Sequence, residues 1–142
     1  MYQNCGGKRQ SYRIYTQDSF GKQCILESSY ELRTSTILNE LNIKWLRPTF
    51  LYWIDDDGKR HRYYPDFFVP EYNIFIDPKN DYLIKRDSRK IELVQQQNNI
   101  VILVLSNSEI NKETIEKKLH QCSFLNGGAC RIRTDLISTL QV

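Results

Sequence analysis

A run of six consecutive aliphatic residues at positions 100–105 constrains the fold of this chain more than any other feature. The run has the length of a strand and is far shorter than the roughly 18 apolar residues that span a bilayer. A strand that is apolar on both sides must be covered on both faces, as in parallel sheets that lie between helices. The polar segment before it, residues 86–98, has a few apolar positions and predicts a helix. The strand therefore follows a crossover helix and is expected to run parallel to an earlier strand.

Local signals predict the other elements. Ser28 and Glu31 have the spacing of a capping box, which starts a helix. Gly58, after Asp57, suits the positive φ of a hairpin turn, and Pro78 stops a strand because it cannot donate to a ladder. The expected elements are short strands at 10–15 and 23–26, a helix at 28–42, strands at 50–54, 61–69 and 72–77, a helix at 86–98, the apolar strand and a helix at 108–120. The sequence thus predicts an α/β fold, more closely an α+β mixed sheet: a helix, a three-strand meander, a helix and a strand, with helices on both faces.

The 142 residues suit one domain of ordinary size. We expect a basic N-terminal arm at 1–27, a core at 28–121 and a C-terminal tail at 122–142. The first residues contain no apolar signal-peptide core, so a cytoplasmic protein is expected, or a phage- or organelle-encoded one that acts on DNA. No membrane association is expected.

Four cysteines are spread over the chain without a Cys-x-x-Cys pair: Cys5, Cys24, Cys122 and Cys130. Zinc sites usually combine closely spaced cysteines with each other or with paired histidines. In a cytosolic protein the simpler interpretation is four reduced thiols. A zinc site is the weaker alternative.

Basic residues gather in three places, near positions 8–22, 59–62 and 85–90, although the net charge is only +3. Any one cluster is adequately explained as solvated charge on a turn or a helix face. Three clusters near one candidate site, with tyrosines between the charges, favour a surface that faces phosphates. The residues expected to contact DNA are Arg13, Lys59, Arg60, Arg62, Lys85 and Lys90.

Two carboxylates are expected to meet at one edge of the sheet. Asp66 lies in the strand before the turn at 70–73, and Asp77 ends the strand after it. Paired carboxylates form a hard-oxygen site that suits Mg²⁺. Lys79 points to the same face as Asp77 if the strand continues, and the carbonyl of Pro78 is a possible third ligand.

Each of these residues also has a plainer interpretation. Asp66 can be read as a turn cap, Asp77 with Pro78 as the end of a strand, and Lys79 as a surface lysine. Glu31 is either the capping-box acid alone or a helix carboxylate that joins the metal site. Lys90 is either a surface lysine, a phosphate contact or a displaced catalytic lysine.

Residues 64–79, with the sequence Tyr-Pro-Asp-Phe-Phe-Val-Pro-Glu-Tyr-Asn-Ile-Phe-Ile-Asp-Pro-Lys, resemble the signature of PD-(D/E)XK nucleases. The chain is similar in particular to small homing-type endonucleases of phages and introns, over about residues 28–105. The resemblance implies a restriction-endonuclease-like core and Mg²⁺-dependent hydrolysis of DNA phosphodiesters, with Mn²⁺ as a substitute. It assigns metal binding to Asp66 and Asp77 and an assisting role to Lys79. Three positions depart from the usual pattern: Asp77 replaces Glu, Pro78 replaces an apolar strand former, and Asn80 stands where Gly is frequent.

The expected function is therefore a site-specific endonuclease that cuts both strands of duplex DNA. Cutting both strands with one site per chain requires a homo-oligomer, a dimer or a tetramer. A structure-specific nuclease, either a junction resolvase or a mismatch nickase, is an alternative within the class. A catalytically degenerate DNA-binding module is an alternative from another class, and a small-molecule-binding domain is disfavoured because there is no glycine-rich phosphate loop.

Overall fold

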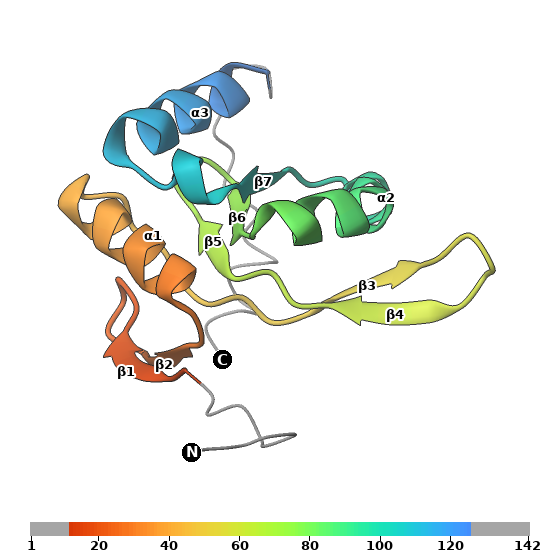
Figure 1. Cartoon of the computed structure of the whole chain (residues 1–142), viewed down its shortest axis with the longest axis horizontal. Helices are drawn as coiled ribbons and strands as arrows, with labels where there is room; N and C mark the ends of the chain where they lie inside the picture. The colour runs from red at the N-terminus through yellow and green to blue at the C-terminus, as the bar shows by residue number, and fades with distance from the viewer. Residues whose placement is uncertain (1–11, 126–142) are drawn as a thin grey trace, which may run out of the picture.

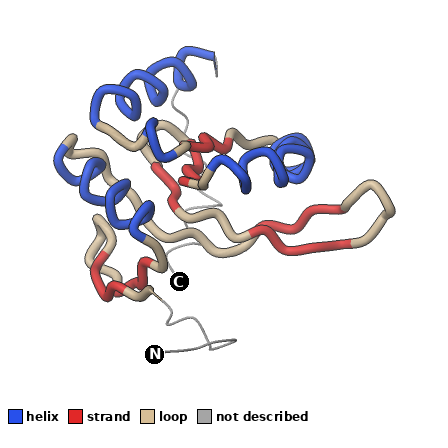
Figure 2. Tube along the Cα trace, in the orientation of Figure 1, coloured by secondary structure: helices blue, strands red, loops and turns tan. Residues whose placement is uncertain are grey.

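The computed structural model describes residues 12–125 and shows a mixed α/β fold (Figure 1). The helices are α1 (Ser29–Glu40), α2 (Asp81–Asn98), the 3-10 turn η1 (Asn107–Glu109) and α3 (Lys112–Leu125). The strands are β1 (Ile14–Gln17), β2 (Gln23–Leu26), β3 (Leu51–Ile54), β4 (Arg60–Tyr63), β5 (Phe67–Val69), β6 (Ile74–Pro78) and β7 (Ile102–Leu105). Figure 2 shows the same trace coloured by helix and strand. Within residues 12–125, no helix is long and apolar enough to cross a membrane.

The central sheet has the strand order β5-β6-β7. β5 and β6 are antiparallel and are joined by a tight turn in which Asn73 adopts φ +53°. Asparagine tolerates this left-handed conformation better than most residues. β7 pairs with β6 in parallel after the crossover through α2. The parallel pairing predicted from the apolar run is confirmed.

The two faces of this sheet belong to two separate apolar clusters. Alternate strand residues, among them Phe67 and Ile76, pack with α1 and α3, where Leu38 and Leu119 are buried. The intervening strand residues, among them Phe75, pack with α2. Alternation of side chains along a strand produces this division. Helices therefore cover both faces, as the sequence predicts.

The expected three-strand meander is wrong in one respect, because the strand predicted at 61–69 is divided into β4 and β5. Pro65 lies at the division and has no N–H to donate to a ladder. β3 and β4 consequently form their own two-stranded ladder. The free edge of β5 is used instead by Leu46, whose N–H and carbonyl both bond to Phe68, at 3.0 and 2.9 Å.

The β3–β4 hairpin extends away from the central sheet (Figure 1) and is held at one side by α2. The side-chain amide of Gln97 bonds both backbone groups of Ile54, each at 2.7 Å. Trp53 and Tyr63 are buried in the same cluster as Val94 of α2. These contacts leave the opposite face of the hairpin uncovered by α2.

The starts of two helices differ from the sequence expectation, and α3 also continues past the expected residue 120 to Leu125. α2 starts at Asp81 rather than near residue 86, because Asn80 caps it by accepting from the N–H of Leu83 at 2.9 Å. α3 starts at Lys112 rather than at residue 108, since η1 precedes it with its own capping box of Ser106 and Glu109. Both caps are short polar motifs that lie outside the apolar periodicity.

Candidate active site

Asp66 and Asp77 lie side by side at the end of the β5–β6 pair. The backbone N–H of Asp66 donates to Oδ1 of Asp77 at 2.7 Å. Asp77 is only 1% exposed, whereas 26% of the Asp66 side chain is exposed. The structure thus brings together the two carboxylates that the sequence places on either side of the turn.

Both carboxyl groups bind protons more tightly than free aspartate. Burial, followed by the negative charge of Glu31, raises the pKa of Asp66 to about 7 against the opposing charges of Arg47 and Lys79. Burial also raises the pKa of Asp77 to about 6, although the N–H of Asp66 and the charge of Lys79 act in the other direction. The nearby cations therefore do not fully compensate the two buried charges, and a proton or an added cation would stabilise the pair.

Lys79 follows β6 and is held next to α2. Its backbone N–H donates to the carbonyl of Leu105 at 2.8 Å, which continues the pairing with β7 by one residue. Its side chain is 15% exposed, and Nζ lies 3.6 Å from Oδ2 of Asp87. The ammonium acts electrostatically on both Asp66 and Asp77. Lys79 is therefore close enough to the carboxylate pair to lower the pKa of both aspartates.

Asp87, in α2, is a site residue that the sequence reasoning missed. It is 6% exposed, and its Oδ2 lies 3.6 Å from Nζ of Lys90 as well as 3.6 Å from Nζ of Lys79. A hydrogen bond from Arg86, followed by the charges of both lysines, lowers the pKa of Asp87. Its spacing of three residues from Lys90 on a helix was the available signal. Asp87 therefore forms ion pairs with both Lys79 and Lys90.

The direction of the Pro78 carbonyl follows from the geometry of its peptide unit. The N–H of Lys79 belongs to the same peptide unit and points to β7. The described residues contain no cis peptide, and a trans unit holds N–H and C=O on opposite sides. The carbonyl of Pro78 is therefore directed away from β7, to the side of β6 on which β5 and Asp66 lie.

Glu31 reaches the site through Arg47, a second residue that sequence reasoning missed. Glu31 is 8% exposed and accepts from the Glu27 N–H at 3.0 Å and the Ser28 hydroxyl at 3.2 Å, so the capping interpretation holds. Arg47 Nη1 also lies 2.9 Å from Glu31 Oε1 and donates to the Asp66 carbonyl at 2.9 Å. Arg47 occurs in an irregular segment, and no periodic pattern marks it. It links the start of α1 to the backbone of Asp66.

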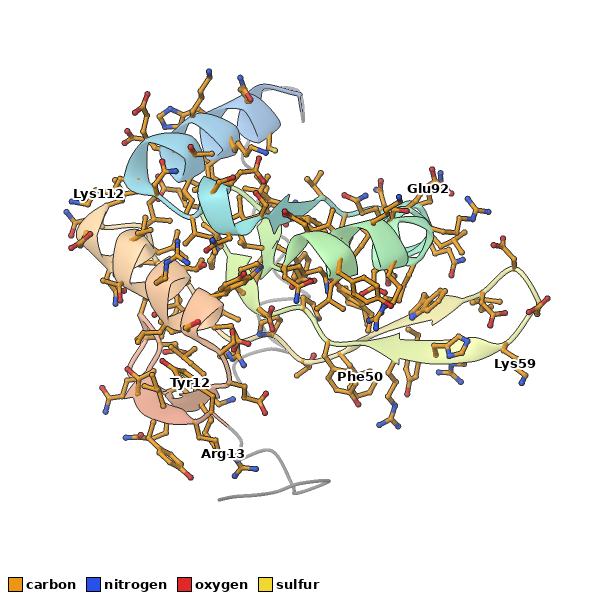
Figure 3. All side chains as sticks on the ribbon, viewed as in Figure 1. Tyr12, Arg13, Phe50, Lys59, Glu92 and Lys112 are labelled. Atoms are coloured by element: carbon orange, nitrogen blue, oxygen red, sulfur yellow. The ribbon has the colours of Figure 1, made fainter. Side chains whose placement is uncertain are left out.

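The residues expected to contact DNA are not all in one place. Arg60 and Arg62 are exposed on β4, and Lys59 lies at the outer end of the hairpin (Figure 3). Arg13 is exposed beside β1, at the opposite part of the molecule in the same view. Lys85 and Lys90 are in α2, where Lys85 is exposed and Lys90 pairs with Asp87. The structure therefore separates Arg13 from the other basic residues.

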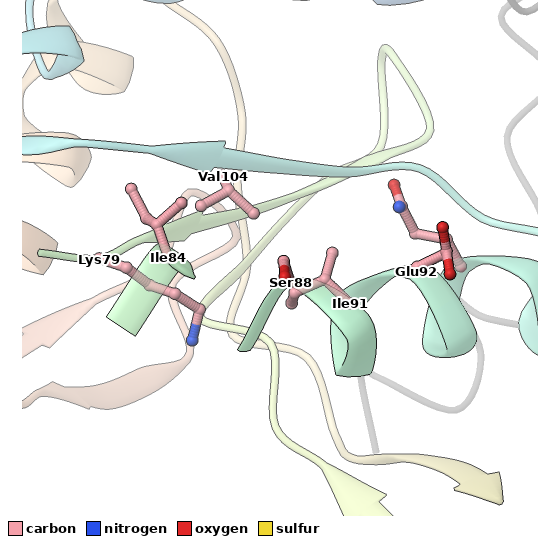
Figure 4. Close-up of a pocket in the computed structure, with 7 residues that line it drawn as sticks. Lys79, Ile84, Ser88, Ile91, Glu92 and Val104 are labelled. Carbon is pink, nitrogen blue, oxygen red and sulfur yellow. The ribbon is translucent and has the colours of Figure 1, made fainter. Parts of the chain in front are cut away.

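A pocket of about 310 Å³ lies next to Lys79, between β7 and α2. Figure 4 shows Lys79 at one end and Glu92 at the other, with Ile91 and Val104 between them. Most of its lining is apolar. It leaves room beside the Lys79 side chain.

No group of three or more His, Cys, Asp or Glu side chains that could hold a metal ion occurs in the part of the chain that the structure describes. Of the ligands expected from the sequence, the structure brings Asp66 and Asp77 into direct contact. Cys24 and Cys122 are free, half-buried thiols, and burial raises the pKa of each. Cys5 and Cys130, which the zinc hypothesis also requires, lie outside the described residues.

Comparison of the chain with protein-family models, with curated proteins and with solved structures gave no match.

Proposed function

We propose that this chain is a metal-dependent endonuclease with a restriction-endonuclease-like core, which hydrolyses phosphodiester bonds in duplex DNA. One observation carries the proposal: Asp66 and Asp77 are joined by a 2.7 Å hydrogen bond at the end of adjacent strands, with the largely buried Lys79 two residues further on. This is the constellation that the resemblance of residues 64–79 implies.

The residues present fit a Mg²⁺ ion. Mg²⁺ is usually held by one or two carboxylates and retains several water ligands, so Asp66, Asp77 and the Pro78 carbonyl are a sufficient oxygen set. The raised pKa values of both aspartates also support a cation, because they indicate uncompensated negative charge. When bound, such an ion would neutralise charge on the phosphate and favour ionisation of a water molecule. Mn²⁺ prefers similar ligands and would substitute.

The protein side chains have distinct roles in this proposal. Lys79 donates to a phosphate oxygen or holds the attacking water, and Asp87 keeps its ammonium oriented. Lys90 shares Asp87 and adds positive charge on the same side. Glu31 is paired with Arg47, so it acts by orienting Arg47 and the Asp66 backbone rather than by binding the metal. Glu31 is thus a positioning residue.

Binding of duplex DNA is assigned to the cations of the hairpin and of α2. Lys59, Arg60 and Arg62 on the hairpin and Lys85 and Lys90 on α2 would neutralise phosphates. Arg13 would contact DNA only at a more distant position. Cleavage of both strands would involve two or four copies of the chain, each supplying one site.

A plasmid cleavage assay tests the proposal. The full chain is expected to nick or linearise supercoiled DNA with Mg²⁺ or Mn²⁺ and to be inactive in EDTA. Asp66→Asn and Asp77→Asn should each reduce the rate by about a hundredfold or more, since each removes a metal ligand. Glu116→Gln, which removes a carboxylate from an exposed position of α3, is the matched control and should cleave normally. Undiminished cleavage in either aspartate variant would contradict the assignment.

One observation favours a second candidate, a DNA-binding module without catalysis. Arg47 already supplies positive charge beside Asp66, with Nη1 3.9 Å from Oδ1, so the carboxylate is partly compensated without metal. Isothermal titration with Mn²⁺ separates the two functions. The nuclease should bind Mn²⁺ and lose this binding in Asp77→Asn, whereas the module should bind DNA but show no heat with Mn²⁺.

A further inference from the structure

The outer face of the β3–β4 hairpin combines exposed aromatic, aliphatic and cationic side chains. The register pairs Tyr52 with Arg62 and Ile54 with Arg60, so these four side chains share one face. Tyr52 and Ile54 are 43% and 49% exposed. The other face carries Trp53 and Tyr63, which are buried against α2. We call the exposed face the hairpin outer face; with its flanking aromatics, it consists of Phe50, Tyr52, Ile54, Arg60, Arg62 and Tyr64.

Both arginines of this face are stacked on aromatic rings. Cζ of Arg60 lies 3.6 Å from the centre of the Tyr52 ring, and Cζ of Arg62 lies 4.4 Å from the centre of the Phe50 ring. Stacking restricts the plane of a guanidinium and leaves N–H groups of its edge available for in-plane hydrogen bonds. Arg62 already uses part of this capacity in side-chain hydrogen bonds with Tyr64 and Tyr52. Side chains ordered in this way lose less entropy when they bind a partner.

The positive charge of this face is not neutralised by the acidic turn. Among the described residues, neither Arg60 nor Arg62 forms a salt bridge, whereas Asp55 pairs with His61 at 2.7 Å and Asp56 pairs with Arg89 at 2.8 Å. Those pairs direct two carboxylates of the turn towards the α2 side. The outer face therefore keeps its charge for an anionic partner.

We propose that the hairpin outer face is a base-reading ribbon that enters the major groove of duplex DNA. The major groove is about 12 Å wide and admits a two-stranded β-ribbon. A planar guanidinium matches O6 and N7 of guanine, and an exposed aliphatic side chain such as Ile54 suits the thymine methyl group. Phosphate neutralisation alone would not require the guanidinium planes of both arginines to be held in place on one face.

This inference rests on the proposed nuclease function and adds to it where the DNA sequence is read. Arg62 precedes Asp66 by four residues, so their Cα atoms are at most about 14 Å apart at an extended length of about 3.6 Å per residue. With a rise of about 3.4 Å per base pair, this corresponds to about four base pairs. By the same measure the Cα atom of Arg60, six residues before Asp66, lies at most about 22 Å away, so the ribbon would select bases within about six base pairs of the cleaved bond.

Charge-preserving substitutions test base reading separately from phosphate binding. The full chain is mixed in EDTA with a random-sequence duplex DNA library, and bound duplexes are sequenced for the wild type, Arg60→Lys and Arg62→Lys. Lysine keeps the charge but loses the bidentate fork. We expect each variant to lose about tenfold or more of the preference at one or two base positions, while the slope of log Kd against log salt changes by less than about one. Arg13→Lys, at the other side of the molecule, is the matched control and should retain the wild-type preference.

The possible outcomes separate this inference from the nuclease proposal. If the wild type cleaves DNA but both lysine variants retain its base preference, the proposal of base reading is wrong and the nuclease proposal is supported. If the wild type does not cleave DNA but shows a base preference that the variants lose, the proposal of base reading is supported and the nuclease proposal is wrong. A wild type without base preference, or one that binds duplex RNA equally well, overturns the ribbon, because the deep and narrow major groove of RNA excludes it. Unchanged melting temperatures of the variants establish that both fold.

Discussion

Asp66 and Asp77 are held close together in the folded protein at the expense of its stability. Two carboxylates that are buried next to one another favour protons, and the raised pKa values of about 7 and about 6 follow from this placement. Stability and activity are commonly opposed at sites of this kind. The pair is therefore informative about function even before any ligand is tested.

Replacing either aspartate by asparagine should stabilise the protein at pH 8 in EDTA. Asparagine removes the buried charge but keeps a carbonyl oxygen, so in the Asp77→Asn variant the new side chain would still accept from the Asp66 N–H. We expect the free energy of unfolding to rise by about 3 kcal/mol, since each tenfold change in proton affinity corresponds to about 1.4 kcal/mol. Urea denaturation measures this change, and Glu116→Gln should leave it within about 0.5 kcal/mol. A loss of stability in both variants would indicate that the charges are compensated in the folded state.

Tyr63 provides a second prediction at this scale. Its ring is buried, with Nζ of Lys79 and Lys90 at 6.0 and 5.8 Å from its centre, and its hydroxyl has no hydrogen-bond partner among the described residues. An unsatisfied buried hydroxyl destabilises the folded state. Tyr63→Phe should therefore leave the free energy of unfolding unchanged or raise it by up to about 1 kcal/mol, as measured by urea denaturation. A loss of more than about 1 kcal/mol would show that the hydroxyl is hydrogen bonded in solution.

The sequence pointed to Asp66, Asp77, Lys79 and Glu31 because each lies in a local pattern: a strand, a turn or a cap. It did not point to Arg47 or Asp87. Arg47 acquires its partners from segments that are distant in sequence, and so does Asp87 in its contact with Lys79. Only the i,i+3 spacing of Asp87 and Lys90 is a local pattern.

Among the elements, the hairpin depends on a glycine in its turn. Gly58 adopts φ +83°, and a Cβ placed there would meet nothing within 4 Å. A substitution at this position therefore affects only the backbone conformation. This separates conformational strain from steric clash.

Gly58→Ala should lower the free energy of unfolding by about 1 kcal/mol, because alanine disfavours positive φ. Gly58→Asn is the matched variant and should lose less, since asparagine tolerates this region. Thermal or urea unfolding measures both variants. Equal effects of alanine and asparagine would contradict the conformational explanation.

The order and type of most elements and the parallel pairing of β6 with β7 could be predicted from sequence, but the division of the meander into two ladders could not. Alternation and turn residues predicted strands on both sides of Gly58 and Asn73. They did not show that Pro65 would end one ladder and start another. That division decides which side chains become the uncovered face of the hairpin, because it frees β3 and β4 from the central sheet.

For the whole molecule, the carboxylate pair predicts an unusual dependence of stability on pH. The pKa values of Asp66 and Asp77 are raised above 3.8, so between about pH 4 and pH 7 the folded state binds more protons than the unfolded state. The free energy of unfolding should therefore fall by a few kcal/mol as the pH rises through this range. Below about pH 4 the opposite slope is expected, because Asp87 and Glu109 have lowered pKa values.

Millimolar Mg²⁺ should raise the free energy of unfolding at about pH 8, where the carboxyl groups are ionised. It should have little effect at about pH 5, where they retain protons. Melting temperatures measured across this pH range with Mg²⁺ and with EDTA test the effect. The Asp66→Asn/Asp77→Asn double variant should show a flatter profile and no Mg²⁺ response. An equal response to Mg²⁺ in the wild type and the double variant would exclude binding at this pair.

The tight turn between β5 and β6 also has a consequence for the order of folding. It joins the strands through the shortest loop of the central sheet, so the chain entropy lost on closing it is small. Asp66 and Asp77 are therefore expected to meet early, before the α2 crossover adds β7 and before Arg47 and Glu31 dock. During synthesis on the ribosome, the carboxylate pair would assemble first and Lys79 would be fixed by α2 only afterwards.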